Sequence, residues 1–67
     1  MNRTAIEDRM HEKRISVKRL CREMGIDTST YYRKMQKNGD TFTAYELSAF
    51  KRLLELDAQK AVDMLLP

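Results

Sequence analysis

The chain has 67 residues and a formal net charge of +3, from 13 Lys and Arg against 10 Asp and Glu. A chain of this length folds as a single domain, residues 1–67, with one small core. Its apolar runs are too short to span a membrane and its first residues lack an apolar signal region, so we expect a cytoplasmic protein without a membrane partner. With one cysteine and one histidine, the chain has no internal disulfide and no four-ligand zinc site, and we expect neither metal nor cofactor.

The charge is distributed unevenly along the chain. Residues 1–39 hold ten Lys or Arg and five Asp or Glu, a balance of +5, whereas residues 40–67 hold three and five, a balance of −2. A basic half of this kind favours a polyanionic partner. Many solvated helices are also basic, so charge by itself leaves both interpretations open.

Helix signals run along the chain and no stretch alternates as a strand does, which predicts an all-α domain. Thr4 and Glu7 have the spacing of a capping box and predict a first helix over about 5–13. The cations on this first segment are expected to serve solubility at the surface: Arg3, Arg9 and Lys13.

Two further helices follow across a glycine turn. Ser16 is a suitable N-cap for a helix over about 17–24, and Gly25 stands where a left-handed residue commonly ends a helix. Asp27 or Thr28 then caps a third helix over about 28–36. Its inward pair is Tyr31 and Met35, at a spacing of four residues.

The second half of the chain predicts two more helices. Thr43 and Glu46 form a capping box, and Phe42 and Leu47 occupy the positions of a hydrophobic staple. Asp57 caps a last helix over 58–65. One apolar stripe is expected on this last helix: Ala58, Ala61, Val62 and Leu65.

Two short helices joined by "MGID" are typical of a helix-turn-helix. An ordinary helical hairpin is the alternative, but a hairpin does not require a polar second helix in which no acid follows Asp27. The segment "SVKRLCREMGIDTSTYYRKM" resembles the phage repressor and Cro-type (Xre-like) helix-turn-helix family. The matching positions are Ser16, Leu20-Cys21, Gly25, Ile26 and residues 28–30.

This resemblance implies a compact five-helix, lambda-repressor-like DNA-binding domain with the motif at its second and third helices. With "FTAYE" added, the sequence is most similar to small Cro-like regulators of prophages. Two departures stand out. Val17 replaces the glutamine that often holds a phosphate, leaving only its backbone amide for that role. The end of the third helix reads "MQKNG", which is expected to leave Lys34 free to face solvent or phosphate.

A helix-turn-helix enters the major groove by the N-terminal end of its second helix. Small hydroxyl side chains allow close approach there, and an arginine one turn later can contact guanine O6 and N7 together. The expected base contacts are Thr28, Ser29, Tyr32 and Arg33. The expected phosphate contacts are Ser16, Val17, Lys18, Arg19, Lys34, Lys37 and Asn38. For Tyr32, Lys18 and Arg19 a merely solvated side chain is the alternative.

These features predict a sequence-specific DNA-binding transcriptional regulator, a phage or prophage repressor or Cro-like protein, bound to double-stranded DNA. We expect a homodimer on a palindromic operator, with Met64, Leu65 and Leu66 at the dimer interface, although part of this apolar end would close the monomer instead. The alternative is a protein-interaction module, such as an antitoxin or a repressor-masking partner, that uses its C-terminal helix. The sequence holds no constellation typical of an enzyme.

Overall fold

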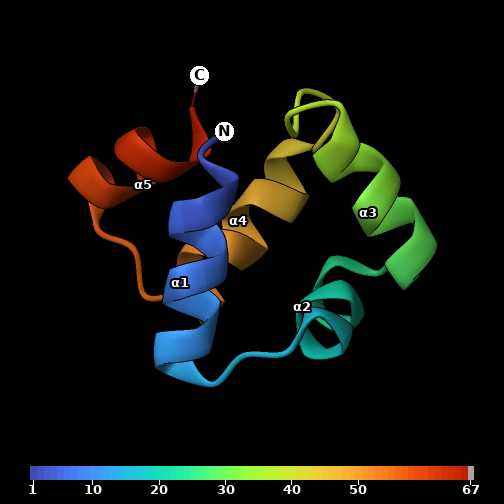
Figure 1. Ribbon diagram of the computed structural model, residues 1–67, viewed down its shortest axis with the longest axis horizontal. Helices are drawn as coiled ribbons and strands as arrows, with labels where there is room; N and C mark the ends of the chain where they lie inside the picture. The colour runs from blue at the N-terminus through green and yellow to red at the C-terminus, as the bar shows by residue number, and fades with distance from the viewer. Residues whose placement is uncertain (67) are drawn as a thin grey trace.

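The structure, a computed structural model, describes residues 1–66, so Pro67 of the expected domain lies outside the described residues. Five helices make up this part of the chain (Figure 1): α1 (Arg3–Lys13), α2 (Val17–Met24), α3 (Thr28–Gln36), α4 (Ala44–Leu53) and α5 (Ala58–Leu65). Residues 1–66 contain no strand, which confirms the all-α prediction. Within these residues, no helix has both the length and the apolar character that crossing a bilayer would require.

Short polar side chains begin the helices, because the first backbone N–H groups of a helix lack partners within it. Ser16, Asp27 and Asp57 cap α2, α3 and α5 as predicted. The capping box of Thr43 and Glu46 is likewise present at the start of α4. Three of the five helix ranges therefore agree with those expected from sequence, namely α2, α3 and α5.

The predicted start of α1 is wrong. This helix begins at Arg3, and the cap is Asn2, whose side-chain oxygen accepts a hydrogen bond from the Ala5 amide at 3.1 Å. The Asn2 amide also donates to the Met64 carbonyl at 2.9 Å. This tertiary bond ties the start of α1 to α5, and it takes Asn2 as the cap in place of Thr4.

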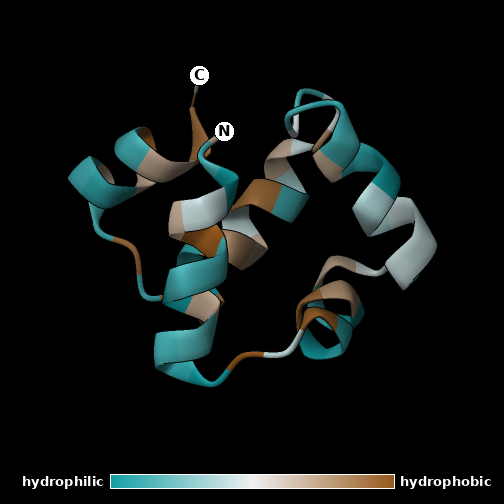
Figure 2. Cartoon of the chain, in the orientation of Figure 1, coloured by the Kyte–Doolittle hydropathy of each residue, from teal (hydrophilic) through white to brown (hydrophobic). Residues whose placement is uncertain are grey.

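Helix α4 lies at the centre of the molecule, with α1 and α5 on one side and α2 and α3 on the other (Figure 1). It packs on α2, while α2 packs on α3 and α1 packs on α5. Hydrophobic segments turn toward this centre (Figure 2). The largest side chains that are fully buried are Ile6, Leu20, Phe50 and Leu54.

The expected apolar stripe of α5 is only partly correct. Leu65 is buried and Ala61 is partly buried, but Ala58 is exposed and the side chain of Val62 is 52% exposed. Helix α5 packs mainly on α1, which covers a narrow face of it and leaves Val62 outside. Leu65 belongs to the monomer core, as the sequence allowed for part of this apolar end, and its role as a dimer contact stays a prediction.

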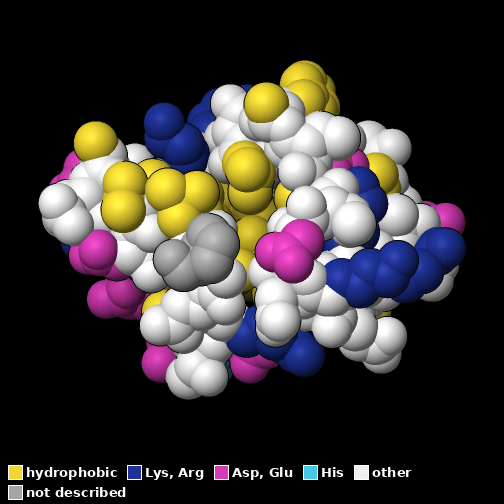
Figure 3. Space-filling model, turned by 90° about the horizontal axis from the view of Figure 1, so that it is seen from above, with side chains coloured by type: hydrophobic (Ala, Val, Ile, Leu, Met, Phe, Trp, Pro, Cys, Tyr) yellow, Lys and Arg dark blue, Asp and Glu magenta, His cyan; other side chains and the backbone are white. Residues whose placement is uncertain are grey.

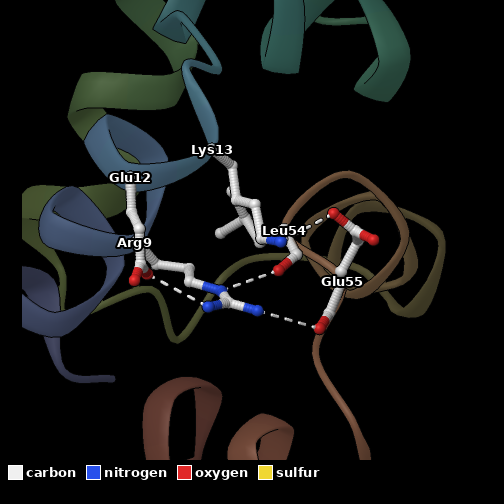
Figure 4. A network of polar contacts seen from close by, with 5 residues as sticks. All are labelled: Arg9, Glu12, Lys13, Leu54 and Glu55. Atoms are coloured by element: carbon white, nitrogen blue, oxygen red, sulfur yellow. Dashed lines mark hydrogen bonds and ion pairs between the residues drawn. The ribbon is translucent and has the colours of Figure 1, made fainter.

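Arg9 and Lys13 are not the solubility charges that the sequence predicted (Figure 4). Arg9 donates to the carbonyl of Leu54 at 2.9 Å and to that of Glu55 at 3.2 Å, and it pairs with Glu12. Lys13 pairs with the Glu55 carboxylate at 2.9 Å. Glu55 has a left-handed backbone (φ 52°) where α4 ends. The two cations thus fix the turn between α4 and α5, a role that no local sequence pattern reveals.

We expect Arg9→Met to lower the free energy of unfolding by about 1–3 kcal/mol, because two charge-assisted hydrogen bonds to backbone carbonyls are lost while the apolar stem remains. Urea denaturation measures the change. Arg22→Met is the matched control: Arg22 is exposed and makes no side-chain bond within residues 1–66, so its effect should stay within about 0.5 kcal/mol. Equal effects of the two substitutions would contradict this role for Arg9.

Candidate nucleic-acid interface

The turn between α2 and α3 has the geometry of a helix-turn-helix. Gly25 ends α2 in the left-handed region (φ 76°), and its amide donates to the Cys21 carbonyl at 2.9 Å. A side chain is strained in this conformation, which explains the glycine. Ile26 is partly buried against the core. The turn therefore brings α3 onto α2 and leaves one face of α3 free.

The inner face of α3 consists of Tyr31 and Met35, both buried as predicted. The Tyr31 ring lies 6.0 Å from the Phe42 ring and 6.3 Å from the Phe50 ring, measured between centroids. Its hydroxyl lies 3.9 Å from the Met10 sulfur. Burial raises the pKa of Tyr31 to about 12, so this side chain stays neutral in the core.

The outer face of α3 carries the residues expected to touch bases. Thr28, Ser29, Tyr32 and Arg33 are all exposed. At about 100° per residue, Ser29 and Arg33 lie on the side of α3 opposite the inward pair, and Tyr32 lies beside that side. Thr28 precedes Tyr31 by three residues and is exposed in the first turn of the helix. Helix α3 forms an outer edge of the molecule (Figure 1), and basic side chains gather on that side (Figure 3).

Asp27 organises the N-terminal end of α3. One carboxylate oxygen accepts from the Thr30 amide at 2.8 Å and from the Ser29 hydroxyl at 3.0 Å. Hydrogen bonds from Thr30 and Ser29 hold the pKa of Asp27 below its usual range. The Ser29 proton is thus engaged within the protein, so this hydroxyl offers its lone pairs to a partner. The Thr28 hydroxyl has no hydrogen-bond partner within residues 1–66.

The positions expected to contact phosphates lie at helix ends. Ser16 caps α2 by accepting from the Arg19 amide at 3.0 Å, and the Lys18 and Arg19 side chains are exposed beside it. The Val17 side chain packs against the core, while its amide is one of the first N–H groups of a helix, which favour anions. At the other end of α3, Lys37 and the left-handed Asn38 (φ 58°) are exposed.

Lys34 differs from the prediction. Its ammonium lies 2.6 Å from a Glu46 oxygen, and the two side chains are only 19% and 7% exposed. The expectation that Lys34 faces solvent freely is therefore wrong. The cause is tertiary: Glu46 stands twelve residues away on α4, and its carboxylate is aimed at α3.

Two residues beside α3 were missed in the sequence. The sequence pattern predicts only a capping-box role for Glu46 and no role for Thr41. A shallow hollow next to the C-terminal half of α3 is lined by Thr30, Arg33, Lys34, Lys37 and Thr41. The position of Thr41 follows from the turn after α3, where Asn38 and Gly39 both have positive φ. The "NG" pair is the sequence signal for such a turn.

A helix-turn-helix whose second helix turns hydroxyl, aromatic and basic side chains outward defines a DNA-binding module. In comparisons with known proteins, a family model described as the Cro/C1-type HTH DNA-binding domain matches residues 5–59. The chain belongs to this family, and it is a DNA-binding transcriptional regulator. No curated protein and no solved structure matches the chain in the same comparisons.

The Glu46 carboxylate makes stability depend on pH. Burial raises its pKa, but the hydrogen bonds from Lys34 and Thr43 outweigh burial and leave the pKa below its usual value. A lowered pKa in the folded state means that the unfolded state binds the proton more readily. The stability that Glu46 contributes is therefore complete above the ordinary glutamate pKa of about 4.3 and is lost as the pH falls through the folded value.

We therefore expect Glu46→Gln to lower the free energy of unfolding by about 1–3 kcal/mol at pH 7. This difference from the wild type should shrink as the pH falls below the ordinary glutamate pKa, because a protonated Glu46 resembles glutamine. Other carboxylates titrate in both proteins, so subtracting the two denaturation curves isolates Glu46. A difference that stays constant with pH would contradict the ion pair.

Proposed function

We propose that the protein is a sequence-specific regulator of the repressor or Cro-like kind, of phage or prophage origin, that reads the major groove with α3. The observation that carries the proposal is the division of α3 into a buried aromatic face and an exposed face with Thr28, Tyr32 and Arg33. Phage origin rests on the resemblance to small Cro-like regulators. The cytoplasmic location stays a prediction from sequence.

The proposed contacts divide by chemistry. Thr28 and Ser29 lie at the end of α3 that enters the groove, and Tyr32 and Arg33 follow one turn later. An arginine that bridges guanine O6 and N7 reads sequence, whereas lysines on phosphates set position only. The proposed phosphate contacts are Ser16, the Val17 amide, Lys18, Arg19, Lys37 and Asn38. Lys34 is not among them, because Glu46 already neutralises it.

We expect Arg33→Ala to lower the preference for a selected site over random DNA by about 1–3 kcal/mol, because bidentate guanine recognition is lost. Lys37→Ala should instead weaken both DNAs alike and reduce the slope of log affinity against log salt by about 0.9. A selection from random DNA supplies the site, and fluorescence anisotropy measures both affinities. Equal losses on both DNAs for Arg33→Ala would argue against base readout by this residue.

We also propose that two copies bind a palindromic operator, with their α3 helices ~34 Å apart. The supporting feature is an apolar hollow between α4 and α5, lined by Leu47, Lys51, Ala61, Val62, Leu65 and Leu66. Val62 and Leu66 are half exposed at its rim, and apolar side chains are visible on the α5 side of the molecule (Figure 3). An exposed apolar patch of this kind suits a twofold interface, in which the same patch of two copies meets. Met64 is partly buried against the core of the monomer.

We expect Leu66→Glu to shift a dimer toward monomer without unfolding the chain, because Leu66 is exposed and a carboxylate there opposes apolar burial. Analytical ultracentrifugation at micromolar concentration, with and without operator DNA, measures the oligomeric state. His11→Glu adds a similar charge at an exposed position outside the hollow and should leave the state unchanged. A wild type that remains monomeric even on operator DNA would defeat the dimer proposal.

The same α4–α5 hollow favours the second candidate function, a protein-interaction module of the antitoxin or repressor-masking type. In that case the occupant is an apolar segment of another protein, and α3 has a lesser role. A gel shift with selected DNA separates the candidates. If the Leu66→Glu variant still binds a single half-site specifically, the regulator is supported. If the wild type binds no DNA at all, the interaction module is supported.

A further inference from the structure

The Lys34–Glu46 ion pair joins the DNA-facing helix to the centre of the fold. Within residues 1–66, Glu46 is the one charged residue that is buried. Its Oε1 atom accepts from the Lys34 ammonium at 2.6 Å and from the Thr43 amide at 2.9 Å. The Thr43 hydroxyl in turn accepts from the Glu46 amide at 3.1 Å. The capping box therefore holds the carboxylate in place independently of Lys34.

Lys34 itself stands among residues proposed to face DNA. It follows Arg33 directly, precedes Lys37 by one turn, and lines the same hollow as both. Its ammonium is drawn inward by Glu46 and by the Phe42 ring, whose centroid lies 5.6 Å away. A lysine stem has four flexible carbons. The direction of this side chain is thus set by its partner and not by its position on α3.

Phosphate contacts carry no sequence information, although each one raises affinity for any DNA. When a cation is kept away from the DNA backbone, affinity for random sequence falls, while the contacts to bases are unchanged. From this geometry we infer that Glu46 is a positioning residue that holds Lys34 away from the DNA backbone and thereby limits non-specific binding. The inference rests on the proposed function, since it concerns the same DNA-facing surface.

Glu46→Gln tests the inference, because the amide oxygen can still accept from Thr43 while the charge that holds Lys34 is gone. An ammonium without a charged partner in a half-buried place is unfavourable, so Lys34 turns outward. The measurement is fluorescence anisotropy on random-sequence duplex DNA over a range of salt concentrations. One additional phosphate contact per chain steepens the salt slope by about 0.9, so affinity falls about three- to fourfold more between 50 and 200 mM salt than in the wild type.

Two further variants separate this effect from a change in structure. Glu46→Gln combined with Lys34→Met removes both charges and should return the salt slope to the wild-type value. Lys34→Met alone should also leave the slope unchanged, because Lys34 does not touch phosphate in the wild type. Circular dichroism establishes that each variant is folded. If Glu46→Gln does not fold, the salt slope of the double variant is compared with that of the wild type, and the two slopes should be equal.

The outcomes are distinct. An unchanged slope for Glu46→Gln, or a slope reduced by about 0.9 for the double variant or for Lys34→Met, would overturn the inference while the proposed function stands. A wild type without any salt-dependent DNA binding would overturn the proposed function, and this inference with it. A steeper slope for Glu46→Gln, which returns to the wild-type value when Lys34→Met is added, supports both the inference and the proposed function.

Discussion

The burial of Tyr31 is the constraint on which the DNA-facing surface depends. This side chain fixes the rotation of α3 about its own axis, because its ring is enclosed by Phe42 and Phe50 and its hydroxyl reaches the Met10 sulfur. Phe42 and Phe50 meet edge to face, with centroids 5.2 Å apart, an arrangement that aromatic rings favour. With Tyr31 and Met35 turned inward, the 3.6-residue period of the helix turns Ser29 and Arg33 outward. Tyr32 lies at the side of this outer face, and Thr28 is exposed in the first turn. The surface proposed to meet DNA is thus a consequence of core packing.

The residues at the helix ends determine where each helix begins and how the chain turns between helices. Each helix begins at a short polar side chain that accepts a hydrogen bond from the first turn, and Gly25 allows the sharp turn that brings α3 onto α2. A domain of this size has a small core and marginal stability. Each cap is worth roughly 0.5–2 kcal/mol, so caps matter here more than they would in a large protein.

The count of 13 Lys and Arg residues overstates the basic surface available to a polyanion. Arg9, Lys13 and Lys34 are held by carboxylates or backbone carbonyls within the chain. The exposed cations on or next to α2 and α3 include Lys18, Arg19, Arg22, Arg33 and Lys37. Selective use of cations suits the sequence-specific binding proposed for this protein, because non-specific attraction to phosphate favours every site equally.

The sequence by itself determined the all-α class, the ranges of α2, α3 and α5, three of the five caps and the inward pair Tyr31 and Met35. It narrowed the cap of α3 to Asp27 or Thr28. These features follow from local rules: a capping side chain acts within one turn, and a helical stripe repeats every three or four residues. The expected DNA contacts rest on the same periodicity together with a family resemblance, and they remain predictions. Only the tertiary structure decided the cap of α1 at Asn2, the exposure of Val62, and the partners of Arg9, Lys13 and Lys34. Each of these depends on an atom far along the chain, such as the Met64 carbonyl or the Glu46 carboxylate, and no local pattern records which distant group will arrive beside a given side chain.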